Sequence, residues 1–308
     1  MQDGKLGFGL IGASTISREW MIDALRASGC AAPIAVYSRD LGRGQAFARE
    51  TGIPRAYASL DALLADPAIE AIYVASTNER HHAEVLAAAA AGKHVLCDKP
   101  LAMSLEQGLE MVEACERAGV VLAVNHHLRN AAHHIAIRDA VRDGRIGKPV
   151  VARIVHGALL PAHLQTWRIR DPAAGAGAVL DLTVHDADLL RFLLDDEIVE
   201  VTAMTANSGM GGPGIEDTAL TVLRTRSGVL GQFHDVFNTP FNRGAVEVHG
   251  TAGSLYGLDV MTQAPRGTVM LRDASGEHEL PLQQENLYVR GLRRFAAATR
   301  GEDSVPCS

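Results

Sequence analysis

The first 124 residues alternate short apolar runs with stretches of helical spacing, and this alternation restricts the possible folds most strongly. The apolar runs span residues 6–11, 34–37, 71–75, 94–97 and 120–124, and helical spacing covers residues 16–28, 44–51, 82–91 and 105–118. Such alternation indicates βαβ units and a parallel sheet. Nearly continuous apolar runs are typical of strands that are covered on both faces. We therefore predict a doubly wound α/β domain over residues 1–124.

The pattern changes after about Asn125. A helical stretch at residues 131–143 precedes runs rich in Val, Thr and Phe at residues 150–160, 198–205, 218–225, 229–237, 246–250 and 268–272, and residues 287–299 have the spacing of a closing helix. These runs predict an α+β domain with a large, mainly antiparallel sheet. We place this domain at residues 125–308. The boundary rests on the change of period, because no Gly, Ser or Pro-rich linker marks it.

Composition excludes several classes of protein. The 308-residue chain has 29 Lys and Arg against 36 Asp and Glu, a net charge of −7, whereas nucleic-acid binding needs clustered positive charge. No apolar run reaches the roughly 18 residues of a membrane span, and the start at Met1–Lys5 lacks the pattern of a signal peptide. No CxxC pair occurs among the four cysteines, so we expect reduced thiols and a cytoplasmic protein without disulfides; they are Cys30, Cys97, Cys115 and Cys307.

A turn with a glycine follows the first predicted strand. Gly7, Gly9 and Gly12 have GxGxxG spacing, but the first two lie inside the strand, whereas the dinucleotide fingerprint begins where the strand ends. We therefore place a phosphate-binding turn, opening a helix whose N–H groups can hold a pyrophosphate, at Gly12-Ala13-Ser14-Thr15-Ile16-Ser17. The turn predicts a Rossmann dinucleotide-binding domain. The alternative is an ordinary βα turn that Ser14 or Thr15 caps.

The end of the second predicted strand bears on the choice of cofactor. NAD-binding folds usually place a carboxylate there, which accepts a hydrogen bond from the ribose 2′-OH. Here Ser38 and Arg39 end the strand, and Arg43 follows one helical turn later. These groups suit a 2′-phosphate, because arginine binds phosphate through charge-assisted hydrogen bonds. We favour NADP over NAD. The alternative is that both arginines are solvated surface charges, and Asp40 would repel the phosphate if it pointed inward.

Polar residues also follow the next two strands. The third strand ends in Ser76, Thr77 and Asn78, and the fourth ends in Asp98-Lys99-Pro100. Ligands of doubly wound folds bind at this carboxyl edge of the sheet. A lysine before proline is sterically restricted, so its ammonium can be aimed at a substrate. We therefore predict a functional Lys99 rather than a simple surface turn.

Three groups of residues resemble motifs of the glucose–fructose oxidoreductase/inositol dehydrogenase (Gfo/Idh/MocA) family. They are Thr77-Asn78-x-x-His81, Ala91-Gly92-Lys93-His94-Val95 with Asp98-Lys99-Pro100, and Asp181-x-x-x-His185. The resemblance covers almost the whole chain. It implies a Rossmann domain followed by an α/β domain with a large mixed sheet, and it implies that Lys99, Asp181 and His185 form the catalytic group.

The chemistry of the implied catalytic residues agrees with this resemblance. Asp181 and His185 are four residues apart, which puts them on one face of a helix if a helix covers them. The carboxylate can then orient the imidazole and raise its proton affinity. An imidazolium is a good general acid for a carbonyl oxygen, and Lys99 can hydrogen-bond the same oxygen as its negative charge grows. The two roles could also be exchanged or shared, and a structural helix pair is the alternative for Asp181 and His185.

The resemblance implies further ligand contacts. Those expected for the cofactor, beyond the phosphate turn and the second strand, are Ser76, Thr77, Asn78, His81, Asp98, Asn125, Trp167, Arg168 and Tyr288. His156 and His163, with Lys99 and His185, are expected to line a sugar pocket. The alternatives are an exposed Trp-Arg loop and a core tyrosine.

The sequence departs from the family pattern at a few positions. Asp98 stands where the family has Glu, and Ser14 and Ser17 stand where the fingerprint has glycine. We also expect the chain, which ends at Ser308, to lack a further C-terminal helix that its relatives carry.

No metal is predicted, despite 13 histidines. Adjacent histidines on a strand or helix point apart, so the doublets are poor chelates. A zinc site formed by Asp181, His185 and His126 is the alternative, although the nearby Lys99 would disfavour a cation.

The resemblance implies NADPH-dependent reduction of a keto-sugar, with 1,5-anhydro-D-fructose as the expected substrate and 1,5-anhydro-D-mannitol as the expected product. A polyol or aldose dehydrogenase of the same family is the second hypothesis. The third is a nucleotide-sensing regulator without catalysis, which the presence of Lys99, Asp181 and His185 argues against. We expect no nucleic-acid or membrane partner, and we leave open a homo-oligomer formed through a broad open sheet.

Overall fold

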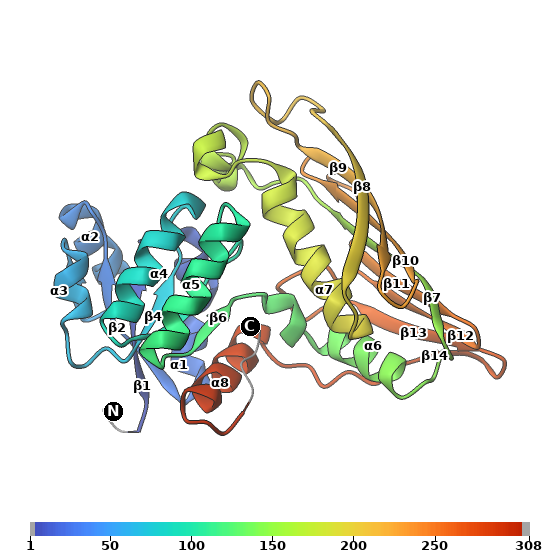
Figure 1. Cartoon of the computed structure of the whole chain (residues 1–308), viewed down its shortest axis with the longest axis horizontal. Coiled ribbons are helices and arrows are strands. Elements are labelled where there is room, and N and C mark those ends of the chain that lie inside the picture. Colours follow the sequence, from blue (N-terminus) through green and yellow to red (C-terminus); the bar gives the residue numbers. More distant parts are fainter. Residues whose placement is uncertain (1–3, 304–308) are drawn as a thin grey trace. The chain divides into compact units, whose positions relative to one another are not determined.

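Six parallel strands form a sheet in the N-terminal part of the chain, in a computed structural model that describes residues 4–303 (Figure 1). The sheet order is β3-β2-β1-β4-β5-β6. The strands are β1 (Leu6–Ile11), β2 (Ala31–Tyr37), β3 (Arg55–Tyr57), β4 (Ala71–Val74), β5 (His94–Cys97) and β6 (Leu122–Val124). This is the doubly wound order that places ligands at the carboxyl ends of the strands, so the predicted Rossmann-type sheet is confirmed.

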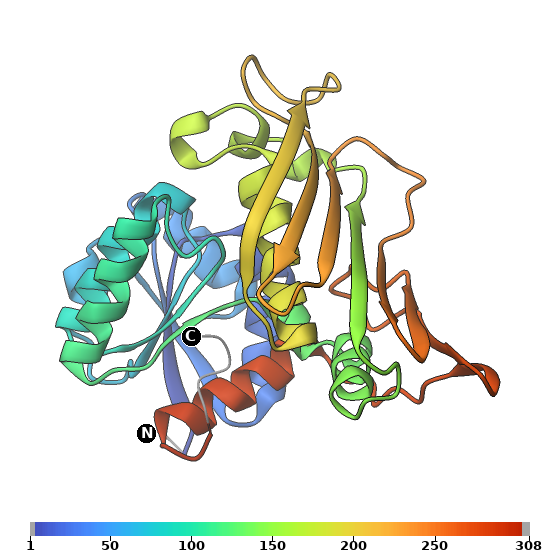
Figure 2. The ribbon, with the colours of Figure 1, turned by 45° about the vertical axis from the view of Figure 1, so that its right-hand side comes forward.

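Helices cover both faces of this parallel sheet, whose strands Figure 2 shows from another side. They are α1 (Ile22–Ser28), which continues a π-helical turn at Ser17–Met21, α2 (Leu41–Thr51), α3 (Leu60–Leu64), α4 (His81–Ala90), α5 (Leu105–Ala118) and α8 (Leu287–Thr299). Leu63, Val85 and Met111 of α3, α4 and α5 belong to one buried apolar cluster with Ile72 and Val95 of the sheet. Burial on both sides accounts for the apolar runs in the sequence.

The chain divides into two compact units, and the first is built from both ends of the sequence. It comprises the residues up to Asn125 and those from Tyr288 onward, and the second comprises His126–Leu287. The sequence analysis placed all residues from 125 to 308 in one domain, whereas α8 groups with the first unit. The reason is packing: the ring of Phe295 lies 5.8 Å from that of Phe8 in β1, and Arg293 donates a hydrogen bond to the carbonyl oxygen of Ser28.

The second unit contains an eight-stranded sheet with the order β14-β13-β12-β11-β7-β10-β9-β8. All neighbours are antiparallel except β7 and β10, as expected for a large, mainly antiparallel sheet. The strands are β7 (Pro149–Gly157), β8 (Ile198–Ala206), β9 (Thr218–Thr225), β10 (Leu230–Val236), β11 (Ala245–Gly250), β12 (Gly253–Leu258), β13 (Thr268–Asp273) and β14 (Gly276–Glu279).

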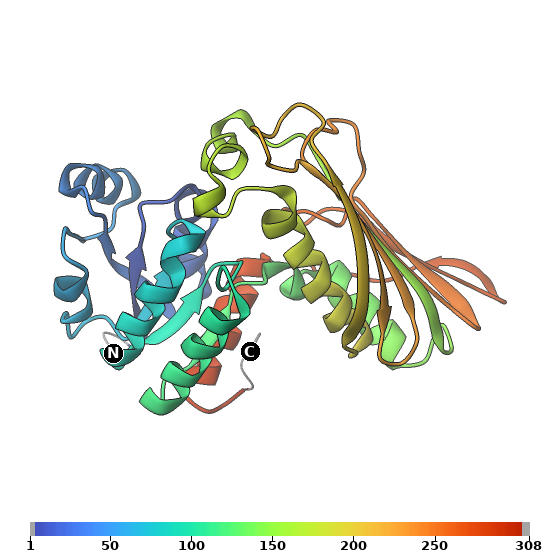
Figure 3. The same cartoon turned by 45° about the horizontal axis from the view of Figure 1, so that its top comes forward.

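Two helices pack on one face of this sheet, as Figure 3 shows. They are α6 (Ala132–Arg142) and α7 (Val184–Leu194). Ile137 and Leu190 of these helices form an apolar core with Ile154, Phe233 and Val246 of the sheet. Large apolar side chains remain exposed on the opposite face of the strands, where we define the open-face patch as Val151, Met204, Leu220, Val222 and Leu230.

Three sequence predictions concern the ends of the chain or its relation to membranes. The start at Met1 and the cysteine at position 307 lie outside the described residues, as does any segment after Ser308. Within residues 4–303, no helix has the length and apolar character needed to cross a membrane.

Candidate active site

Gly12 occupies a position at the end of β1 that only glycine can fill. Its φ is +102°, a conformation that L side chains rarely adopt. A Cβ atom there would lie 2.8 Å from the carbonyl oxygen of Ala75. The predicted phosphate turn therefore begins where a tight turn and a close approach of two strand ends coincide.

Ser14 caps the helix that follows this turn. Its Oγ accepts a hydrogen bond from the N–H of Ser17 at 3.3 Å and lies 2.8 Å from the Oγ of Ser17. The two serines that replace glycines thus bind each other, and Ser17 is fully buried. The N–H groups in the first turn of a helix have no partner within it, so Thr15 and Ile16 present donors at a helix N-terminus, where an anion is favoured.

The end of β2 places one arginine against the same turn. Asp40 is the N-cap of α2, because its Oδ1 accepts from the N–H of Arg43 at 3.0 Å. The Nη2 atom of Arg43 donates to the carbonyl oxygen of Ala13 at 3.0 Å. Ser38 is half-buried and Arg39 is exposed beside them. Asp40 therefore serves the helix terminus, and the guanidinium of Arg43 lies against the turn.

The loops after β4 and β5 are joined by a buried histidine. Nδ1 of His81 lies 2.9 Å from the carbonyl oxygen of Pro100, and Nε2 lies 3.4 Å from that of Ser76. Ser76 also donates to Glu84 at 2.5 Å. His81 thus has a structural role, which sequence reasoning did not assign, and it keeps Ser76 and the half-buried Thr77 at the carboxyl edge. Asn78 beside them is buried.

Lys99 stands at the same edge of the sheet, next to a buried polar network. Nδ2 of Asn125 donates to Asp98 at 3.2 Å and lies 3.5 Å from the hydroxyl oxygen of Tyr73. Burial raises the pKa of Asp98, while Lys99 and His81 act in the opposite direction. Asp98 therefore places a carboxyl beside the Lys99 ammonium, and the Lys99–Pro100 peptide bond is cis.

Tyr288 lies inside the first unit. It is 1% exposed, and its ring stacks on Trp20 with centroids 5.9 Å apart. These contacts fit the core tyrosine that the sequence analysis named as an alternative, and the predicted contact of Tyr288 with the cofactor stays a prediction.

In the second unit, Asp181 and His185 lie on two consecutive helical segments. Asp181 is on the π-helical turn Val179–Thr183, and His185 is on α7, which continues from it. The predicted helical context of this pair is therefore present. Nε of Arg168 lies 3.7 Å from Oδ2 of Asp181, and its guanidinium carbon lies 4.6 Å from the centre of the Trp167 ring. His163, in the same loop, is exposed.

Three other imidazole rings surround His185, which is 6% exposed. The centroids of His127, His126 and His156 lie 4.9, 5.8 and 5.9 Å from that of His185. The expectation that adjacent histidines point apart does not hold for His126 and His127, because a 3₁₀ turn begins between them, at His127. The predicted acid is therefore placed in a cluster of imidazoles.

An ion pair supports this cluster. Arg129 donates to both carboxylate oxygens of Asp188, from Nη2 at 2.6 Å and from Nε at 2.8 Å. Nδ1 of His126 lies 3.7 Å from the same carboxylate. A bidentate Arg–carboxylate pair has a defined geometry, so it fixes the turn that carries His126 and His127 against α7.

Two buried carboxyl groups beside His156 were not predicted from the sequence. Nδ1 of His156 lies 2.9 Å from Oδ1 of Asp186, and Asp235 accepts from Oγ1 of Thr183 at 2.5 Å. Both aspartates are fully buried. Polar atoms of His156, Asp186 and Asp235 lie within 4.8 Å of one another. No local pattern could have revealed this cluster, because α7, β7 and β10 contribute one residue each.

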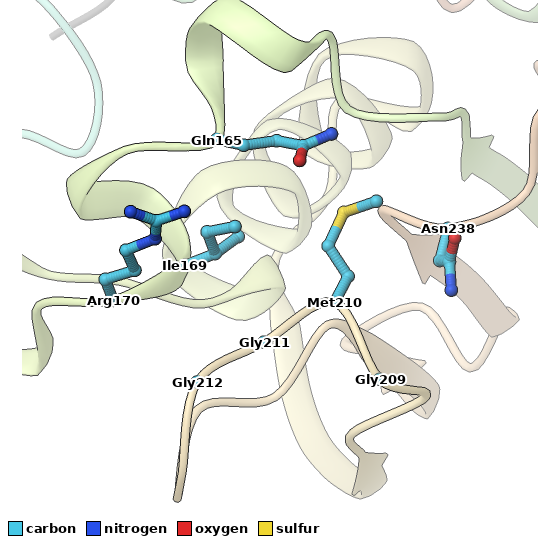
Figure 4. A pocket seen from close by; sticks show the side chains of 8 residues that line it. All are labelled: Gln165, Ile169, Arg170, Gly209, Met210, Gly211, Gly212 and Asn238. Carbon is cyan, nitrogen blue, oxygen red and sulfur yellow. The ribbon is translucent and has the colours of Figure 1, made fainter.

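A cavity of about 350 Å³ opens between two loops of the second unit. Figure 4 shows Gln165, Ile169 and Arg170 on one side and the glycine-rich segment Gly209–Gly212, with Met210, on the other; Asn238 completes the lining. Three of its lining residues, Gln165, Ile169 and Arg170, are close in sequence to Trp167 and Arg168. None of the predicted site residues lines it.

The predicted site residues thus form two groups, one in each unit. The first unit brings together the phosphate turn, Arg43, the β4 and β5 loops, Asp98, Lys99 and Asn125; the second places His156 and His185 in one cluster and Arg168 beside Asp181. That the two groups act on one substrate stays a prediction.

Comparison with known proteins gives matches over most of the chain. A family model described as "Oxidoreductase family, NAD-binding Rossmann fold" matches residues 6–126, and a second, "GFO/IDH/MocA C-terminal domain", matches residues 134–256. The chain is 53% identical over 294 residues to 1,5-anhydro-D-fructose reductase of Ensifer adhaerens, covering 96% of this chain and 88% of that protein. It is 31% identical over 281 residues to myo-inositol 2-dehydrogenase of Thermotoga maritima, covering 90% and 80%.

Solved structures share the fold. An aldose-aldose oxidoreductase from Caulobacter crescentus, complexed with glycerol, matches with a TM-score of 0.88 at 23% identity, covering 97% of this chain and 91% of that one. The 3-ketoreductase KijD10 from Actinomadura kijaniata, in complex with NADP and TDP-benzene, matches with a TM-score of 0.85 at 23% identity, with the same coverage of 97% and 91%.

Proposed function

Since the chain belongs to the Gfo/Idh/MocA family of oxidoreductases, we propose that it reduces the ketone of a keto-sugar with NADPH. The proposed substrate is 1,5-anhydro-D-fructose, and the product is 1,5-anhydro-D-mannitol. The observation that carries the proposal is the 53% identity, over 96% of the chain, to a reductase named for that substrate.

The residues at the carboxyl edge of the parallel sheet fit a dinucleotide. Gly12 leaves the space that a Cβ would fill, and the first helical turn after Ser14 supplies backbone donors suited to a pyrophosphate. Arg39 and Arg43 would hold a 2′-phosphate, and Asp40 does not compete because it caps α2. When bound, NADPH supplies the hydride. The proposed contacts of Ser76, Thr77, Asn78, His81, Asp98, Asn125, Trp167, Arg168 and Tyr288 with the cofactor complete this assignment.

Lys99 and His185 supply the proposed acid chemistry. We assign the proton that reaches the carbonyl oxygen to the imidazolium of His185, which becomes neutral as the hydroxyl forms. The Lys99 ammonium hydrogen-bonds that oxygen and stabilises its growing negative charge. Asp181, held by Arg168, orients the helix segment that carries His185. His156 and His163 are proposed to bind sugar hydroxyl groups.

A polyol or aldose dehydrogenase is the second candidate. It is favoured by the 31% identity to a myo-inositol 2-dehydrogenase. The same residues would then work in the opposite direction, with His185 accepting the proton of a substrate hydroxyl.

One experiment separates these candidates from a regulator without catalysis. The purified protein is given NADPH and a panel of keto-sugars and aldoses, and NADPH oxidation is followed by absorbance, with NADH in parallel. Polyols with NADP⁺ form the reverse arm. We expect the highest kcat/KM with 1,5-anhydro-D-fructose and NADPH. Binding of NADPH without turnover of any panel member would favour the regulator, and better use of NADH would contradict the cofactor assignment.

We also propose that the open-face patch pairs with a second copy of this chain. Monomers rarely expose contiguous apolar patches of this kind, and Met204, Leu220 and Val222 lie on adjacent strands β8 and β9 with 80%, 46% and 59% exposure. The variant Val222→Glu should yield monomers in size-exclusion chromatography with light scattering. Leu105→Glu, at an exposed leucine of α5 in the first unit, should not. Three free cysteines, Cys30, Cys97 and Cys115, agree with a proposed cytoplasmic location.

A further inference from the structure

Asp186 and Asp235 form a carboxyl pair inside the second unit. Each side chain is fully buried. One oxygen of each carboxyl has a hydrogen-bond partner: Asp186 Oδ1 pairs with Nδ1 of His156, and Asp235 Oδ2 accepts from Thr183. The other two oxygens, Oδ2 of Asp186 and Oδ1 of Asp235, are buried and have no hydrogen-bond donor within the described chain. Two oxygens without donors, on neighbouring acids, leave room for one shared proton.

The charge balance also requires this proton. No lysine or arginine of the described chain pairs with either carboxyl. Two ionised carboxylates side by side, away from water, are strongly disfavoured, and such pairs keep one proton between them. Accordingly, burial and the neighbouring Asp186 raise the pKa of Asp235 to about 8, and burial raises the pKa of Asp186 well above its usual range.

The imidazole in contact with the pair belongs to a cluster of described histidines. They are His156 of β7, His185 of α7, His127 of the turn before α6, and His134 of α6. Burial holds the pKa of His134 well below its usual value, so this ring adds no positive charge. His156 is the imidazole in direct hydrogen-bond contact with the pair.

We propose that the Asp186–Asp235 pair holds one shared proton and thereby positions His156 as a hydrogen-bond acceptor for a hydroxyl group of the sugar. The identity of the ligand, a sugar, rests on the proposed function. The shared proton rests only on residues of the second unit. We assign the proton of the His156–Asp186 contact to Nδ1 of His156. The neutral ring then carries its lone pair on Nε2. Asp186 and Asp235 are positioning residues, since they act on the substrate through His156.

Loss of the shared proton would change the donor pattern of His156. Two adjacent negative charges favour the imidazolium over the neutral ring. An imidazolium has two donors and no acceptor, so a sugar hydroxyl that donates to Nε2 loses its partner. The effect falls on substrate binding, and it appears as a rise in KM rather than as a fall in kcat alone.

The variant Asp235→Asn tests the pair, because it keeps size and hydrogen bonding but cannot lose a proton. For the wild type, the KM for the keto-sugar should rise several-fold between about pH 7 and pH 9, as the pair ionises. For Asp235→Asn, the ratio of the KM at pH 9 to the KM at pH 7 should stay near one. Asp61→Asn, an exposed aspartate on α3, is the matched control and should follow the wild type. Equal KM ratios in the wild type and Asp235→Asn would overturn the positioning role.

Two measurements test the proton without any substrate. Infrared spectra of protein with isotope-labelled aspartate should show the carbonyl stretch of a protonated carboxylic acid at about pH 7, and the double variant Asp186→Asn/Asp235→Asn should lack it. The folding equilibrium constant of the wild type relative to Asp235→Asn should fall about tenfold for each pH unit between about 6 and 8, because folding takes up one proton there. The proposal of a shared proton would be overturned if the wild type lacked the infrared band and its folding equilibrium had the same pH dependence as that of Asp235→Asn. This outcome does not depend on whether the protein reduces a sugar.

A bound metal cation could also neutralise the charge of the Asp186–Asp235 pair, and metal analysis tests this alternative. The isolated protein should hold no stoichiometric divalent cation, and added Zn²⁺ or Mn²⁺ should not raise its melting temperature more than that of Asp235→Asn. A stoichiometric cation that Asp235→Asn loses would overturn the proposal in favour of a metal site.

Discussion

The guanidinium of Arg43 donates a hydrogen bond of 3.0 Å to the carbonyl oxygen of Ala13. One residue thus links the start of α2 to the turn after β1. Asp40 accepts from the backbone N–H of Arg43, so its carboxylate caps the helix, while the guanidinium of the same arginine bonds the turn.

Arg43→Ala should raise the KM for NADPH about 10- to 100-fold and change the KM for NADH far less. A hydrogen bond to a charged group contributes about 1.5–3 kcal/mol, and only NADPH carries the 2′-phosphate. Steady-state kinetics with both cofactors provide the measurement. Arg49→Ala, an exposed position on the same helix, is the control. If both KM values rose equally, Arg43 would support the turn rather than bind the 2′-phosphate. The variant Arg39→Ala would then show whether the other arginine binds the 2′-phosphate.

His185→Ala should lower kcat by about 10²- to 10⁴-fold, the usual contribution of a general acid. The KM for NADPH should change little, because the proposed role of His185 is toward the carbonyl oxygen. Turnover of the keto-sugar by the variant gives the comparison, with His278→Ala, an exposed histidine of β14, as control. A kcat within about threefold of the wild type would show that another group supplies the proton.

Gly12→Ala should destabilise the first unit by about 2–5 kcal/mol, from a strained backbone and a close contact with Ala75. Gly92→Ala is a matched control, since Gly92 also has a positive φ, +68°, but a Cβ there meets nothing within 4 Å. Urea unfolding should give a clearly larger loss for Gly12→Ala, and NADPH titration should show weaker binding. Equal losses for the two variants would exclude the contact with Ala75 as the cause.

Acidification should destabilise the protein through two buried histidines of α6. Burial lowers the pKa of His133 to about 4 and holds the pKa of His134 well below its usual value. The unfolded chain therefore takes up protons at a higher pH than the folded one, and stability that is complete above about pH 6.5 is lost as the pH falls toward 4. The slope is up to about 1.4 kcal/mol per pH unit for each histidine.

Urea unfolding of His133→Asn at several pH values isolates this effect. The variant should lose less stability than the wild type between about pH 6 and pH 4.5, whereas His278→Asn should match the wild type. The comparison with variants matters because the Asp186–Asp235 pair acts in the opposite sense over part of this range, as its raised pKa favours the folded state on acidification. Identical slopes for the wild type and His133→Asn would contradict a buried neutral His133.

Sequence patterns predicted helices and strands well where an apolar run was long enough to be recognised. Residues 6–11, 94–97 and 218–225 were predicted as strands with the bounds that β1, β5 and β9 have. The pattern missed β3, with only three residues, and β14, whose four residues are all exposed. A strand without a buried face has no apolar alternation to detect. The strand β12 was missed because glycines interrupt its short apolar pattern.

The candidate site was predictable only where neighbours in sequence are also neighbours in space. The turn at Gly12 and the Asp181–His185 spacing are local patterns. The Asp186–Asp235 pair is not, since its members come from a helix and from a strand in the middle of the sheet. The contact of His126 and His127 with His185 likewise depends on where a 3₁₀ turn begins, which the His doublet does not reveal.

The grouping of α8 with the first unit has a consequence for biosynthesis. Phe8 of β1 meets Phe295 only after the entire second unit has left the ribosome. A nascent chain that has finished the parallel sheet still lacks one of its covering helices, so a patch of that unit stays uncovered during translation. Chaperone occupancy should therefore peak on chains that end before α8 and fall once this helix emerges.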